Sequence, residues 1–115
     1  MSQYPNDENG AVLRSMAAQG IDLVSSRLVD FEHRFPTETA AMAFLAAVQG
    51  TVSEARLIRP GSEEDREWDV QCRERMIPTH AAITGTERRL AEVAKRFNGY
   101  ADGWGSLSNP DGSPA

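Results

Sequence analysis

Residues 29–35 alternate between apolar or aromatic side chains and charged ones, and this alternation constrains the fold more than any other feature of the chain. The first side carries Val29, Phe31, His33 and Phe35. The second side carries Asp30, Glu32 and Arg34. A period of two with β-branched and aromatic residues indicates a strand with one buried face. Such a strand needs a sheet whose apolar face is covered by other elements.

The segments around this strand, which we expect at 27–35, predict three helices and three further strands. An apolar stripe predicts a helix over 7–19. After Pro36, Thr37 is a good N-cap for an alanine-rich helix that ends at Gly50. The remaining predicted elements are strands at 51–59, 66–76 and 100–107 and a helix at 79–97.

The order of these elements is a helix followed by β-α-β-β-α-β, the split βαβ order of a ferredoxin-like sandwich. We therefore expect an α+β fold, with two helices on one face of a four-stranded antiparallel sheet and an extra N-terminal helix. A single domain should span 7–107, with a frayed N-terminus at 1–6 and a disordered tail at 108–115. The expected main core is Phe31, Phe35, Phe44, Leu45, Trp68, Val70, Leu90 and Phe97.

Composition excludes several classes of protein. The 115 residues include 17 Asp and Glu against 12 Lys and Arg, a formal net charge of −5. An acidic chain lacks the basic footprint of direct nucleic-acid binding, but it can bind a basic partner. No apolar run is long enough to span a membrane, and no secretory signal is visible. The single cysteine, Cys72, rules out an intramolecular disulfide and a cysteine metal cluster within one chain.

Few residues could carry catalysis. His33 lies on the apolar side of its strand, where a neutral structural histidine is favoured, and His80 is interpreted as a surface residue at a helix start. The rival interpretation is a small hydrolase or metal-binding enzyme that uses His33 with Glu32 or Glu74. Alternation places His33 and Glu32 on opposite faces of the strand. We therefore expect no enzymatic activity, no catalytic residue, no metal, no cofactor and no small-molecule substrate.

The charged face of the sheet is expected to neutralise itself. Its carboxylates are Asp30, Glu32, Glu54 and Asp69. The arginines interleaved with them are Arg34, Arg56, Arg73 and Arg75.

Two features are candidates for protein binding. The run 63–69 holds five acids and one base at a hairpin tip, and it could steer a basic partner. In Asp102-Gly103-Trp104, the tryptophan either packs at the sheet edge or serves as an exposed anchor, and we favour the structural role. In that role Asp102 should accept a hydrogen bond from a nearby backbone N–H. The candidate protein-binding residues are Glu63, Glu64, Asp65, Glu67, Asp102 and Trp104.

Three segments carry a family resemblance. The first is Val29-Asp30-Phe31 with Phe35-Pro36 and the alanine-rich helix, and the second is Arg75-Met76-Ile77-Pro78 with Ala82-Ile83-Thr84. The third is Asn98-Gly99-Tyr100-Ala101-Asp102-Gly103-Trp104-Gly105, which is similar to a Gly-Gly-x-Tyr-Asp-Gly-Trp signature. In this order, over about 7–105, the segments resemble the family of the protein regulator of ribonuclease E activity B. Tyr100 stands one position before the tyrosine of the signature, which places its ring on the opposite side of the strand.

The resemblance implies a ferredoxin-like sandwich and a cytoplasmic bacterial protein that binds ribonuclease E, inhibits RNA cleavage and changes transcript abundance. It implies no catalytic residue and no cofactor. The predicted function is therefore a non-catalytic regulator that binds ribonuclease E or a similar RNA-processing protein. The alternative is a small ferredoxin-like interaction domain with a different protein partner.

Overall fold

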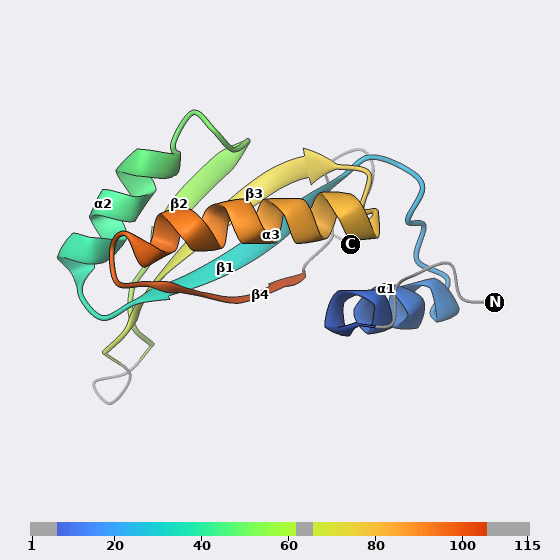
Figure 1. Ribbon diagram of the computed structural model, residues 1–115, viewed down its shortest axis with the longest axis horizontal. Helices are drawn as coiled ribbons and strands as arrows, with labels where there is room; N and C mark the ends of the chain where they lie inside the picture. Colours follow the sequence, from blue (N-terminus) through green and yellow to red (C-terminus); the bar gives the residue numbers. More distant parts are fainter. Residues whose placement is uncertain (1–6, 62–65, 106–115) are drawn as a thin grey trace.

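The computed structural model of the chain describes residues 7–61 and 66–105 (Figure 1). These residues form an α+β fold of three helices and a four-stranded antiparallel sheet. In chain order the elements are α1 (Glu8–Ala18), β1 (Arg27–Phe35), α2 (Glu38–Val48), β2 (Glu54–Ile58), β3 (Trp68–Met76), α3 (His80–Lys95) and β4 (Tyr100–Gly105). None of the helices in the described ranges is both long enough and apolar enough to cross a membrane.

The strands lie in the order β2-β3-β1-β4, so β2 and β4 form the edges of the sheet. In the central β1–β3 pair Phe31 lies opposite Cys72, and β4 pairs with β1 across a bulge between Glu32 and His33. Helices α2 and α3 pack on the same face of the sheet, whereas α1 lies apart, near the N-terminal end of α3 (Figure 1).

Each helix begins at a side chain that accepts a backbone hydrogen bond. Asp7, Thr37 and Thr79 each accept from the N–H three residues further on, as expected of Asp and Thr at an N-cap. After α1, Gly20 adopts a φ of 83°, a backbone conformation that is accessible to glycine without strain. The predicted helices at 7–19 and 79–97 are longer than α1 and α3 because they include such capping residues.

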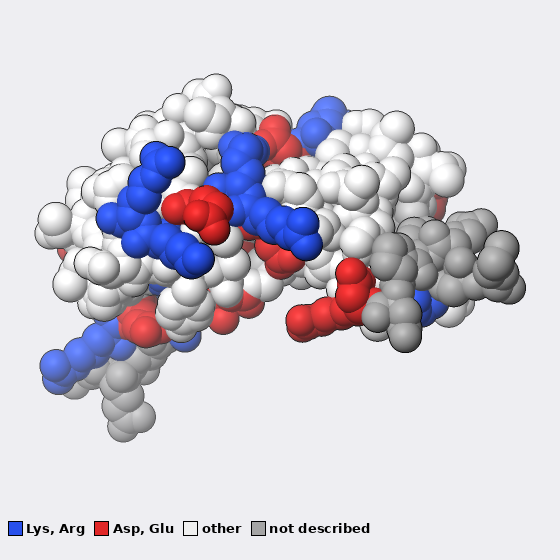
Figure 2. Space-filling view, viewed as in Figure 1, with Lys and Arg blue, Asp and Glu red and all other residues white. Residues whose placement is uncertain are grey.

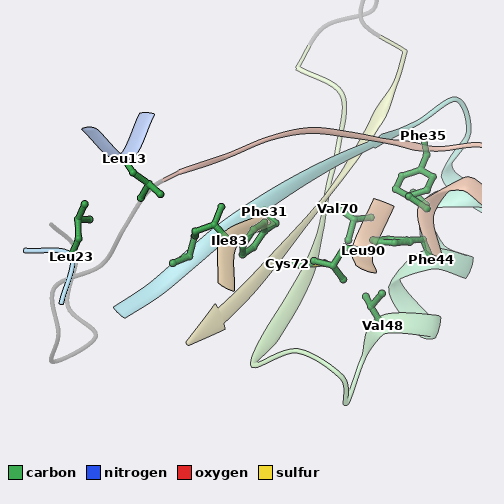
Figure 3. Close-up of a cluster of buried hydrophobic side chains, with 13 residues drawn as sticks. Leu13, Leu23, Phe31, Phe35, Phe44, Val48, Val70, Cys72, Ile83 and Leu90 are labelled. Atoms are coloured by element: carbon green, nitrogen blue, oxygen red, sulfur yellow. The ribbon is translucent and has the colours of Figure 1, made fainter. Parts of the chain in front are cut away.

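One cluster of side chains forms the core, between the sheet and the two helices that cover it (Figure 3). Five residues of the predicted main core are buried: Phe31, Phe35, Phe44, Val70 and Leu90. The prediction was wrong for Leu45, Trp68 and Phe97, which are only partly buried and pack against the margin of the cluster. Trp68 stands at the first position of β3 and Phe97 lies beyond the end of α3, so solvent reaches both.

The second strand is shorter than the predicted segment 51–59. Gly50 has a φ of 85°, and the hydroxyl of Thr51 donates to the carbonyl of Val48 at 2.8 Å, so the chain turns before the strand begins. Ala55 and Leu57 of β2 are partly buried and pack against the core. The predicted ends of the domain, 1–6 and 106–115, lie outside the described residues.

Cys72 is fully buried, and burial raises the pKa of its thiol to about 12. The thiolate is the reactive form of cysteine, so we expect the native protein to resist alkylation by iodoacetamide at pH 8. In urea the thiol should react at the rate of an ordinary cysteine. Because the chain has one cysteine, mass spectrometry reports the reaction directly. Rapid labelling of the folded protein would contradict the burial.

Candidate functional site

The outward face of the sheet is a network of ion pairs. Arg73 Nε lies 2.8 Å from Asp30 Oδ1, and Arg34 Nε lies 3.0 Å from Asp69 Oδ1. Both pairs join residues that lie opposite one another on β1 and β3. For these residues the interpretation of a mutually neutralising face is confirmed.

Glu67 belongs to this network. Its carboxylate accepts a hydrogen bond from the Tyr100 hydroxyl at 3.0 Å and lies 3.4 Å from Arg34 Nε. Tyr100 lies opposite Arg34, and its hydroxyl reaches the outward face of the sheet at Glu67. The other three acidic candidates, Glu63, Glu64 and Asp65, lie outside the described residues.

Polar contacts hold the start of α1 against α3 and β4. His80 lies at the surface at the start of α3, as interpreted, but it is partly buried: its side chain is 21% exposed and its Nε2 lies 2.9 Å from Asp7 Oδ2. Asn9 Nδ2 donates to Thr84 and to Glu87, at 3.1 and 3.0 Å.

The carboxylate of Asp7 is charged at neutral pH, because the backbone N–H of Gly10 and the contact with His80 both lower its pKa. Leu13, on the same helix, is fully buried.

Trp104 is bound into the same junction. Its Nε1 donates to Asn9 Oδ1 at 3.0 Å, and its ring packs against the margin of the core. The indole remains partly exposed, so the favoured packing of Trp104 at the sheet edge fits the structure, while its use as a binding anchor stays a prediction.

A groove of about 380 Å³ lies between α1, α3 and β4, and Trp104 forms part of its wall. The predicted site residues Asp102 and Trp104 come together here. No pattern in the sequence indicates the residues that α1 and α3 contribute to this groove. The full lining is Glu8, Asn9, Val12, Glu87, Ala101, Asp102, Gly103 and Trp104.

The bulge in β4 shapes one wall of this groove. Ala101 lies opposite His33 and Gly103 lies opposite Glu32, so Asp102 is the extra residue. A bulge redirects the side chain of the residue that it inserts. Asp102 is exposed and makes no hydrogen bond to another described residue, so the expected bond to a backbone N–H stays a prediction.

The two ends of α3 differ in charge. Figure 2 shows basic side chains gathered over the C-terminal half of the helix and acidic ones below it, toward α1. Arg89 contacts Glu74 at 3.2 Å, and Lys95 contacts Glu92 at 3.5 Å. On this face the basic side chains therefore gather over the C-terminal half of α3, although carboxylates pair with two of them.

The geometry gives the rival enzymatic interpretation no support. His33 is 1% exposed and its ring packs 5.0 Å from that of Phe44, measured between centroids. Glu32 lies on the opposite face, and Glu74 lies four positions away from the partner of His33 along β3, about 13 Å. Among the described residues, no group of three or more His, Cys, Asp or Glu side chains is placed to hold a metal ion.

The comparisons with known proteins agree with the resemblance seen in the sequence. The family model for RraB, regulator of ribonuclease activity B, matches residues 6–106. Neither a curated protein nor a solved structure matches the chain. The match covers nearly the whole chain, including every helix and strand of the fold and the groove beside Trp104, and the chain therefore belongs to the RraB family of regulators of ribonuclease activity.

Proposed function

We propose that this protein is a non-catalytic regulator that binds ribonuclease E, or a similar bacterial RNA-processing protein, in the cytoplasm and slows the cleavage of RNA. Membership of the RraB family, over residues 6–106, carries this proposal. The family description names regulation of a ribonuclease, and ribonuclease E is the enzyme that the resemblance implies. We also assign the β-α-β-β-α-β part to the ferredoxin-like sandwiches, which the strand order supports.

We place the contact with the ribonuclease at the groove beside β4. The segment 98–105, which carries part of the family resemblance, supplies Asp102 and Trp104 to its wall. A packed tryptophan with an exposed edge is a frequent anchor of protein interfaces. The acidic run at 63–69 would act at longer range, by attracting a basic partner before contact.

The experiment that tests this function is an RNA-cleavage assay with purified ribonuclease E. Added protein should bind the enzyme in a pull-down and slow cleavage of a structured RNA. Binding should weaken as salt rises, because exposed charges are screened beyond about 8 Å at physiological ionic strength. Unchanged cleavage at saturating protein, with no ribonuclease recovered, would leave only an interaction domain for another partner.

The contribution of the acidic run can be measured separately. Replacing Glu63, Glu64 and Asp65 by their amides should lower the association rate constant more than it raises the dissociation rate constant, since steering acts before contact. Surface plasmon resonance against immobilised ribonuclease E measures both. Equal association rate constants for the wild type and the triple variant would contradict a steering role of the acidic run.

A further inference from the structure

We infer that the groove between α1, α3 and β4 receives an arginine side chain from a basic segment of the partner, with the guanidinium against Trp104 and among the carboxylates around it. The inference rests on the proposed function for the source of that segment. Its physical basis is the charge, the aromatic wall and the size of the groove.

The charge of the lining selects a cation. Three side chains of the lining are carboxylates and none is Lys or Arg. Glu8 and Asp102 are exposed and make no hydrogen bond or ion pair with another described residue, whereas Glu87 is partly committed to Asn9. Two carboxylates of the lining, one from α1 and one from β4, therefore have no other described partner and can meet a positive group that enters the groove.

The aromatic wall favours arginine among the cations. The indole of Trp104 is fixed by the bond to Asn9 and by the core behind it, so it stands as a preformed surface. A guanidinium can stack on an aromatic ring and at the same time donate to carboxylates in its own plane. A lysine ammonium can approach the ring as a point charge but cannot form the planar fork.

The size and shape of the groove suit a side chain. Its volume of about 380 Å³ is near the lower end of the range for ligand pockets, too small for a helix or a strand pair. On the β4 side Gly103 has a φ of 125° and carries no Cβ, and nothing lies within 4 Å of where one would be. No side chain of β4 therefore fills the groove at this point, which leaves space for the aliphatic part of an entering arginine side chain.

The test uses an arginine-rich peptide as the probe, with matched peptides in which lysine or citrulline replaces each arginine. Citrulline keeps the shape of arginine and lacks the charge. The arginine peptide should bind most tightly, the lysine peptide more weakly and the citrulline peptide not measurably. In nuclear magnetic resonance spectra the indole N–H of Trp104 and the amides of 101–103 should shift. Equal binding of the citrulline peptide, or shifts confined to other parts of the protein, would overturn the inference.

Two double variants with the same change in net charge distinguish binding in the groove from general attraction by the negative charge of the protein. Glu8→Gln with Asp102→Asn should weaken binding of the arginine peptide about tenfold. Glu38→Gln with Glu92→Gln, which lie outside the groove lining, should change it by less than about twofold. Equal losses in the two variants would show that the peptide binds through net charge and not in the groove.

The same variants distinguish this inference from the proposed function. If ribonuclease E binds the Glu8→Gln, Asp102→Asn variant as tightly as the wild type, the groove assignment is wrong and the function stands. If the groove binds the arginine peptide but ribonuclease E does not bind the protein, the proposed function is wrong and the site stands.

Discussion

Replacing Gly99 by alanine is expected to lower the free energy of unfolding by about 3 kcal/mol. A Cβ at this position would overlap the ring of Phe35 and stand 2.8 Å from the carbonyl oxygen of Arg34. The ring has little room to move, since Phe35 is fully buried and packs against Phe44 with 4.9 Å between ring centroids. The backbone between α3 and β4 would have to shift instead.

Gly85→Ala is the matched control. Gly85 lies within α3, is exposed, and has nothing within 4 Å of an added Cβ. Alanine there should raise the free energy of unfolding by about 1 kcal/mol, because glycine is a poor helix former. Urea denaturation of the two variants and the wild type measures both changes. If both substitutions changed the free energy of unfolding in the same direction, the close approach of Gly99 to Phe35 would be contradicted.

The second large effect is the pH dependence that His33 imposes on stability. Burial lowers the pKa of His33 to about 4 from an ordinary value of 6.5, and its Nδ1 has no hydrogen-bond partner among the described residues. As the pH falls below 6.5 the unfolded chain takes up a proton that the folded one does not. Stability should therefore decrease from pH 6.5 downward, by about 3 kcal/mol at pH 4, and the contribution should level off below that.

His33→Leu isolates this contribution from the other titrating groups. The stability of the variant should fall less between pH 7 and pH 4 than that of the wild type, by about 3 kcal/mol. The hydrogen-bonded carboxylates of Asp7 and Asp22, whose pKa values are lowered, act mainly below 3.8 and are common to both proteins. Parallel stability curves for the two proteins across this range would contradict a buried neutral His33.

Part of the candidate site was visible in the sequence and part was not. Asp102 and Trp104 stand out because they are adjacent to glycine in a short segment near the end of the chain. In the sequence, Glu8, Asn9 and Glu87 look like ordinary polar residues on the surfaces of helices. Local patterning does not specify how a helix docks, so nothing in the sequence indicated that Asn9 would hold Trp104 beside these carboxylates.

The glycines also show which features a sequence can indicate and which depend on the tertiary structure. Gly50 is predicted to end the alanine-rich helix, and both Gly50 and Gly20, which follows α1, have positive φ, a local requirement that the residue type indicates. After α3 it is Asn98, and not the adjacent Gly99, that takes the left-handed conformation, with a φ of 62°. Gly99 is needed for a different reason, its approach to Phe35, which is 64 positions away in the chain.

What the sequence by itself determined is the type and order of the elements, the faces of the strands and the helix starts. Period-two alternation, capping side chains and helix-ending glycines act within a few residues, so they can be read without the fold. The tertiary structure alone decided which residues share the groove, why His80 pairs with Asp7, and which predicted core residues remain at the margin. Those properties arise from contacts between residues far apart in the chain, in particular the docking of α1 on α3 and β4, and a local pattern does not encode that geometry.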